Sequence, residues 1–101
     1  MAKKRRKLNK DFEKKIYSSR KNVELVLAKI YDIDDEDIQK EYISAFNRVV
    51  YLYESLKMDY EQQGYNDNSE ELMTNYKNAF NLFESEFEIW FTSYKVLQES
   101  Q

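Results

Sequence analysis

The sequence predicts an all-α fold of three long helices in an elongated antiparallel bundle that self-associates. The chain of 101 residues contains no Pro and one Gly, which suits long helices and not a turn-rich β protein. Apolar residues recur every three or four positions in three separate stretches, whereas a strand would show a period of two. We expect a flexible basic arm over residues 1–7 and a single helical domain over residues 8–101.

The three predicted helices cover residues 8–31, 35–63 and 69–98. The period of each stretch places a set of residues on one buried face. In the first helix these are Leu8, Phe12, Ile16, Ser19, Val23, Val26 and Ile30. In the second they are Ile38, Tyr42, Phe46, Val49, Tyr53, Leu56 and Tyr60. In the third they are Met73, Tyr76, Phe80, Phe83, Phe87, Trp90, Tyr94 and Leu97.

The two joints between these helices carry residues typical of helix ends. Acids at positions 34–37 stand where the second helix begins. Acids there accept hydrogen bonds from free N–H groups and face the positive end of the helix dipole. Gly64 is the only glycine and predicts a Schellman stop in which Tyr65 folds back on Tyr60. The polar residues 66–69 then form a loop and the cap of the third helix.

Self-association follows from the length of the helices and the width of their apolar stripes. A helix of about 28 residues is ~42 Å long, whereas a compact domain of this size has a radius of gyration of ~13 Å. A thin bundle cannot bury all of these apolar side chains in its own core. We expect a homo-oligomer to bury the remainder. The expected surplus comprises Tyr51, Leu52, Leu82, Ile89 and Phe91.

An aromatic stripe along the third helix is the predicted oligomer interface. It consists of Tyr76, Phe80, Phe83, Phe87, Trp90, Phe91 and Tyr94. Helical spacing favours either core packing or an interface between copies. A platform on which bases stack is the weaker interpretation.

The composition excludes the commonest catalytic and metal chemistry. Without Cys there is no disulfide and no thiolate nucleophile, and without His the usual general base and zinc ligand are missing. The acids at 32 and 34–37 lack the glycine and the distant Glu of a calcium loop. We therefore expect a protein that is not an enzyme and has no catalytic residues, no metal and no cofactor.

Neither a membrane span nor a secretory signal is expected. No apolar run approaches ~18 residues. The opening MAKKRRKL has charged residues but no apolar segment after them. These observations predict a cytoplasmic protein with no membrane partner.

Positive charge is concentrated in the first quarter of the chain. Residues 3–29 hold eleven Lys or Arg against three acids, and residues 30–101 hold five against sixteen. The arm contributes five consecutive cations, which are Lys3, Lys4, Arg5, Arg6 and Lys7. In the first helix Lys10, Lys14 and Lys21, here called the lysine row, share one face with Tyr17 and Lys7. Ammonium groups along one face predict contact with the phosphates of nucleic acid, DNA above all.

Other interpretations of the charge remain open. The basic residues also fit a solvated face that keeps the chain dispersed, or a surface for an acidic protein or anionic lipid. The acids of the remainder also fit a mimic of the DNA backbone. The main alternative function is therefore an acidic helical interaction module, an inhibitor or adaptor with a protein partner.

The order of segments resembles that of the small subunits of tailed-phage terminases. Those proteins often begin with a basic segment, as in MAKKRRKLNK, followed by an acid-rich helix start like DIDDED. A tyrosine-studded helix that ends at glycine comes next, like EYISAFNRVVYLYESLKMDYEQQG, and then another helix like SEELMTNYKNAFNLFESEF. The resemblance covers most of the chain. It implies a ring-forming, DNA-recognising packaging component of a phage or mobile element.

Overall fold

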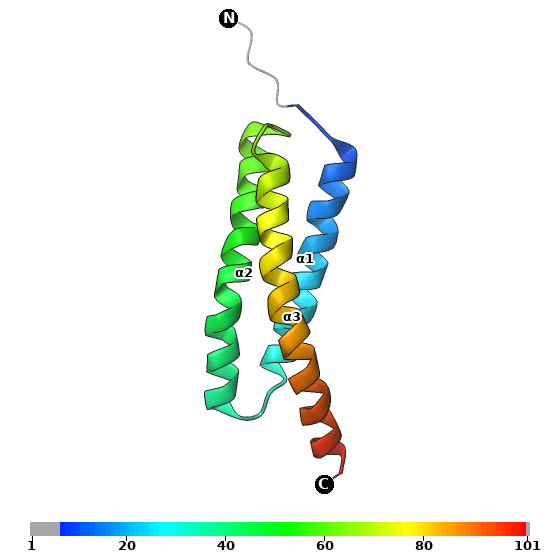
Figure 1. Cartoon of the computed structure of the whole chain (residues 1–101), viewed down its shortest axis with the longest axis vertical. Coiled ribbons are helices and arrows are strands. Elements are labelled where there is room, and N and C mark those ends of the chain that lie inside the picture. Colours follow the sequence, from blue (N-terminus) through cyan, green and yellow to red (C-terminus); the bar gives the residue numbers. More distant parts are fainter. Residues whose placement is uncertain (1–6, 101) are drawn as a thin grey trace, which may run out of the picture.

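The computed structural model describes residues 7–100 and contains three helices, α1 Lys10–Tyr31, α2 Glu36–Gln63 and α3 Ser69–Glu99. α1 and α3 run in the same direction and α2 runs against them (Figure 1). The described chain contains no strand, only an isolated bridge between Lys7 and Gly64. The predicted all-α, three-helix bundle is confirmed, and its helix ends lie within two residues of the predicted ones.

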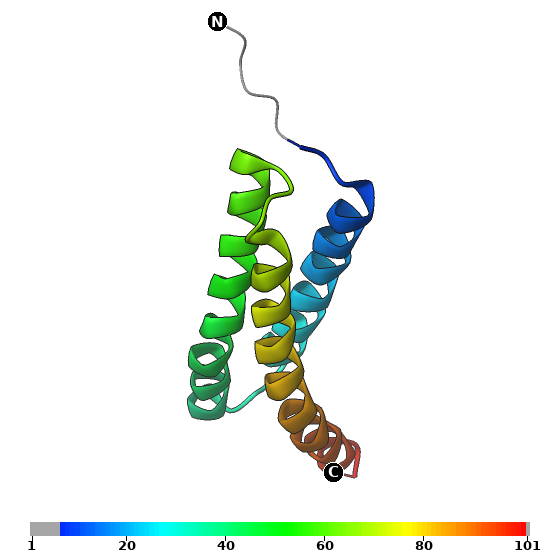
Figure 2. The ribbon, with the colours of Figure 1, turned by 45° about the horizontal axis from the view of Figure 1, so that its top comes forward.

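The bundle is elongated, as predicted. Its extents are 67 × 22 × 17 Å and its radius of gyration is 16.9 Å, against ~13 Å for a compact domain of this length. α3 is longer than α1, so its last turns extend beyond the α1–α2 loop (Figure 1). Figure 2 shows α1 lying at an angle to the α2–α3 pair. None of the described helices combines the length and the apolar composition needed to cross a lipid bilayer.

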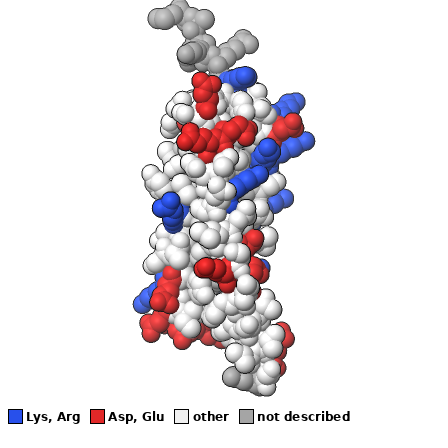
Figure 3. Space-filling model, in the orientation of Figure 1, with Lys and Arg blue, Asp and Glu red and all other residues white. Residues whose placement is uncertain are grey.

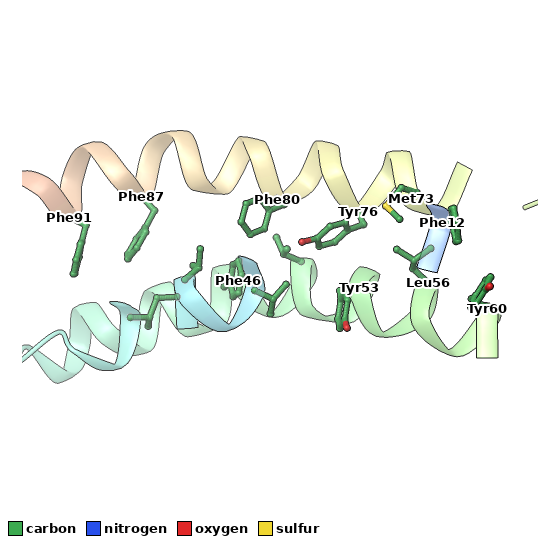
Figure 4. Close-up of a cluster of buried hydrophobic side chains, with 14 of the residues drawn as sticks. Phe12, Phe46, Tyr53, Leu56, Tyr60, Met73, Tyr76, Phe80, Phe87 and Phe91 are labelled. Atoms are coloured by element: carbon green, nitrogen blue, oxygen red, sulfur yellow. The ribbon is translucent and has the colours of Figure 1, made fainter. Parts of the chain in front are cut away.

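A single core runs along the bundle and is built mainly from aromatic rings. Tyr42 contacts Phe87 with ring centroids 4.9 Å apart, and Phe46 contacts Phe83 at 4.8 Å. Phe80 and Phe87 point from α3 toward α2 (Figure 4). The predicted faces are confirmed except at their ends, where Leu8 and Leu97 are 69% and 65% exposed.

Leu8 is exposed because α1 begins after it. The backbone N–H of Phe12 donates to Asn9 Oδ1 (3.0 Å), so Asn9 caps the helix and Lys10 is its first residue. Sequence periodicity extended the helix past this cap. At the joint between α1 and α2 the capping prediction is confirmed, because Asp35 Oδ1 accepts from the N–H groups of Asp37 (3.0 Å) and Ile38 (3.1 Å).

The end of α2 differs from the predicted Schellman stop. Gly64 has φ 72° and ψ −164°, which is far from the left-handed helical region that such a stop uses and is open to glycine alone. The chain therefore leaves α2 extended, and the N–H of Tyr65 donates to the carbonyl oxygen of Lys7 (2.7 Å). The Tyr65 ring packs edge-on against Phe12, with centroids 5.2 Å apart. The hydrogen bond to Lys7 ties the segment before α1 to the α2–α3 joint.

The aromatic stripe of α3 packs within one chain. Tyr76, Phe80, Phe87 and Phe91 are buried. The remaining members, Phe83, Trp90 and Tyr94, are partly buried against the same core. Core packing, one of the two interpretations of this spacing, therefore accounts for the stripe.

Two of the five residues of the expected apolar surplus do not lie exposed on the surface. Phe91 belongs to the core and Leu52 packs against it. Tyr51, Leu82 and Ile89 are 70–74% exposed. Of this set, only these three exposed residues are available for contact between copies of the chain.

Candidate nucleic-acid interface

The lysine row lies on the outer face of α1. Lys10, Lys14, Tyr17 and Lys21 are all exposed, and Figure 3 shows Lys and Arg side chains gathered over the first half of α1. The opposite face of the helix is buried in the core. At 1.5 Å per residue the row spans roughly 16 Å of helix. Of the predicted arm, Lys3, Lys4, Arg5 and Arg6 lie outside the described residues.

The three lysines of the row have no carboxylate partner within residues 7–100. Two nearby acids are already engaged by other groups. The Tyr60 hydroxyl donates to Glu13 Oε1 (2.8 Å). Arg20 Nε donates to Glu24 Oε1 (2.9 Å), which raises the pKa of Arg20. The ammonium groups of the row are thus available to an external anion.

Tyr17 and Lys21 form one unit within this surface. Lys21 Nζ lies 4.9 Å from the centroid of the Tyr17 ring, a cation–π distance. Tyr17 is 59% exposed. Lys7, before the helix, is placed similarly, with Nζ 5.8 Å from the Tyr65 ring centroid. The face therefore presents both ammonium groups and an accessible aromatic ring.

A groove of about 210 Å³ opens between α1 and α2, beside the lysine row. Its walls include Ile16 and three tyrosines, Tyr17, Tyr53 and Tyr60. Its charged lining residues are Arg20, Lys57, Glu13 and Glu61. Burial raises the pKa of the Tyr53 hydroxyl above its usual value. Sequence reasoning missed the groove, since Tyr53 and Tyr60 were assigned to the core alone.

A second groove, of about 640 Å³, runs between α2 and α3. Ala45 and Ala79 line it together with Leu52 and Leu82, and small side chains on facing helices leave such a depression open. Arg48 and Glu86 add one charge of each sign. The sequence gives one signal for it, an alanine in each of the two facing helices.

Two acids of the cluster at 32–37, Asp32 and Asp34, make contacts with the end of α3. Asp32 Oδ2 accepts from Lys95 Nζ (2.6 Å), and Asp34 Oδ2 accepts from Gln98 Nε2 (2.8 Å). The N–H of Asp34 donates to the Tyr94 hydroxyl (2.8 Å). Across residues 7–100 no three acids converge in a way that would hold a metal ion. These acids anchor the α1–α2 loop to the end of α3.

Comparisons with protein-family models, with curated proteins and with solved structures gave no match.

Proposed function

We propose that this chain is a cytoplasmic, non-enzymatic protein that binds nucleic acid, with DNA as the first candidate, by contacting phosphates. The observation that carries the proposal is the exposure of Lys10, Lys14 and Lys21 on one face of α1 without a carboxylate partner in residues 7–100. The five cations at 3–7 extend the same charge toward the start of the chain. Lysine contacts of this kind position a protein on the backbone but do not read sequence.

The resemblance in segment order to small terminase subunits suggests a setting for this activity. We infer DNA packaging or handling in a phage or mobile element, a task that needs backbone contact and benefits from several copies acting together. The basic first quarter of the chain supports the first requirement.

The test replaces the lysine row and follows binding to duplex DNA over a salt series. Each phosphate contact contributes about −0.9 to the slope of log K against log salt. The variant K10Q/K14Q/K21Q is therefore expected to lose about 2.7 from that slope. The matched control is K40Q/R48Q/K77Q, which removes the same charge from exposed positions of α2 and α3 that have no carboxylate partner in residues 7–100 and should leave the slope near the wild-type value.

Two outcomes would contradict the proposal. Equal losses in the two triple variants would mean that only net charge matters. Absence of binding by the intact protein to any polynucleotide in dilute buffer would remove the proposal altogether. Circular dichroism of each variant shows whether the helices are retained.

A deletion measures the contribution of the cations before the bundle. The variant should lack residues 2–6 and keep Lys7, because the carbonyl oxygen of Lys7 accepts a hydrogen bond from Tyr65. If Lys3, Lys4, Arg5 and Arg6 all contact phosphates, the slope should fall by about 3.6. An unchanged slope would confine the interface to α1.

We also propose that the chain self-associates through the outer face of α3. Leu82, Ile89 and Val96 are 70%, 74% and 56% exposed, and their seven-residue spacing aligns them in one stripe. In an antiparallel pair centred on Ile89, Leu82 of one copy meets Val96 of the other. Sedimentation at several concentrations should show a dimer that Ile89→Lys abolishes, and a monomer at high concentration would contradict it.

The alternative function, an acidic helical interaction module, is favoured by the α2–α3 groove. It is larger than the α1–α2 groove and has an apolar wall that includes Leu82. If a protein partner binds there, Ala45→Lys, which places a charge in the groove but lies outside the Leu82–Ile89–Val96 stripe, should abolish the complex and K10Q/K14Q/K21Q should leave it intact. The reverse pattern would favour nucleic acid.

A further inference from the structure

We propose that the groove between α1 and α2 receives an unpaired nucleobase, so that the protein prefers single-stranded nucleic acid to duplex. The inference rests on the proposed function, because the phosphates next to that base lie on the lysine row. It adds a ligand class to this surface, and it makes Tyr17 the residue that distinguishes the two forms of nucleic acid.

The charges of the groove suit a base, whereas the charges of the lysine row suit phosphates. The groove is lined by two cations, Arg20 and Lys57, and by two carboxylates, Glu13 and Glu61, so its formal charge is balanced. Arg20 is in addition paired with Glu24. The carboxylates disfavour a phosphate inside the groove, whereas the unpaired lysines outside attract one. A neutral base with hydrogen-bonding edges fits the first environment, and its backbone fits the second.

Aromatic rings supply the contact that a base requires. Tyr17 lines the groove and is 59% exposed, so its ring is accessible for stacking. Every base has a π-face, and a stacked aromatic ring typically contributes about 5- to 150-fold in affinity without sequence preference. Tyr53 and Tyr60 are almost fully buried behind it, so they give the groove a fixed floor.

Lys21 links the two environments. Its Nζ lies 4.9 Å from the Tyr17 ring centroid, so a base at this ring has an ammonium group within reach of its own phosphate. The arrangement is that of single-strand binders, which combine a basic track with rings on which bases stack. In a duplex the bases are paired and stacked inside the helix, so only the phosphate contacts remain.

The experiment measures the affinity of the full-length protein for two probes at one salt concentration. One is an oligothymidylate of about twenty nucleotides and the other is a mixed-sequence duplex of about twenty base pairs. The wild-type protein should bind the single strand about tenfold more tightly. Tyr17→Ala should lose that preference, because its loss of affinity for the single strand should be about tenfold larger than its loss for the duplex. Tyr17→Phe retains the ring and should retain the preference.

A matched control and a direct signal of stacking complete the design. Tyr51→Ala removes a tyrosine that is 70% exposed on α2 and does not line the groove, and it should change neither affinity. A 2-aminopurine base in the single strand should be quenched by the wild type and by Tyr17→Phe, but not by Tyr17→Ala.

The outcomes distinguish this inference from the function on which it rests. Equal affinity of the wild type for both probes, or a Tyr17→Ala variant that keeps the single-strand preference, overturns the inference and leaves phosphate binding in place. Failure to bind either probe overturns the proposed function itself.

Discussion

The two ends of the bundle use the same residue types in opposite ways. At the end where α1 begins, the lysine row has no carboxylate partner among residues 7–100. At the end where α1 finishes, Lys29 Nζ donates to Glu88 Oε1 and Lys95 Nζ donates to Asp32 Oδ2, both at 2.6 Å. Both of these ammonium groups also lie within 6 Å of the Phe91 ring centroid. A count of lysines therefore says little about function, since pairing decides which of them are available to a ligand.

The core changes along the same axis. Near the start of α1 the buried rings are mostly tyrosines, such as Tyr53, Tyr60 and Tyr76. The Tyr76 hydroxyl donates to the carbonyl oxygen of Ser19 (3.3 Å). Toward the other end of α3 the buried rings are those of Phe87 and Phe91, which are in contact with each other. Tyr42, Trp90 and Tyr94 are only partly buried beside them. The tyrosine end thus places hydroxyl groups beside the candidate interface, where Tyr53 and Tyr60 line the α1–α2 groove.

The largest expected effect lies in the phenylalanine end. Phe87 is fully buried, so Phe87→Ala should lower the free energy of unfolding by about 3–5 kcal/mol. Ile89, two residues further on, is 74% exposed, and Ile89→Ala should change it by no more than about 0.5 kcal/mol in dilute protein. Urea unfolding measures both. A comparable loss from Ile89→Ala in dilute protein would mean that this side chain is buried in solution.

The next effect concerns the tyrosine end and appears at alkaline pH. Burial raises the pKa of Tyr76 from 10.0 to about 12. As the pH rises, Tyr76 therefore ionises in the unfolded chain before it ionises in the folded one. The contribution of the neutral Tyr76 hydroxyl to the free energy of unfolding is complete below pH 10 and is lost as the pH rises toward 12. The loss amounts to about 2–3 kcal/mol. Burial shifts the pKa of Tyr53 in the same direction.

Urea unfolding at a series of pH values between 9 and 12 tests this expectation. Tyr76→Phe has no hydroxyl to ionise at this position, so its stability should fall less steeply over the interval. If the variant follows the wild-type curve, Tyr76 does not carry the pH dependence. Phe80→Leu, a buried change in the same helix without a titrating group, serves as the control.

Local rules predicted the helices well. Periodicity and capping residues act over three or four positions, and they placed all three helices and the Asp35 cap. They missed one local feature, the Asn9 cap that starts α1 at Lys10, and they failed at the end of α2, where a contact distant in sequence decides the geometry. At Gly64 the chain leaves α2 in an extended conformation, because the N–H of Tyr65 donates to the carbonyl oxygen of Lys7. The Tyr60 hydroxyl likewise donates to Glu13, which lies 47 positions away in the sequence.

The candidate site was predicted in part for the same reason. Helical spacing sufficed to group Lys10, Lys14, Tyr17 and Lys21, and the structure exposes all four. The groove beside them is lined by residues of both α1 and α2. Its shape depends on how the two helices pack together, which the sequence pattern of one helix does not specify. Periodicity likewise marks the rings of α3 as interior, but it does not say whether the interior belongs to one chain or to two copies.

The smallest effect tests the difference between the ends most directly, at a single lysine in each. A double-mutant cycle of Lys29→Gln and Glu88→Gln should give a coupling of about 0.2–1 kcal/mol, because both side chains are more than a third exposed. Lys14→Gln should alter stability by less than about 0.5 kcal/mol. Binding to DNA should show the reverse order, with Lys14→Gln weaker than wild type and Lys29→Gln unchanged. If Lys29→Gln weakened binding as much as Lys14→Gln did, the paired lysine would be as available to phosphate as the unpaired one, and the distinction between the two ends would fail.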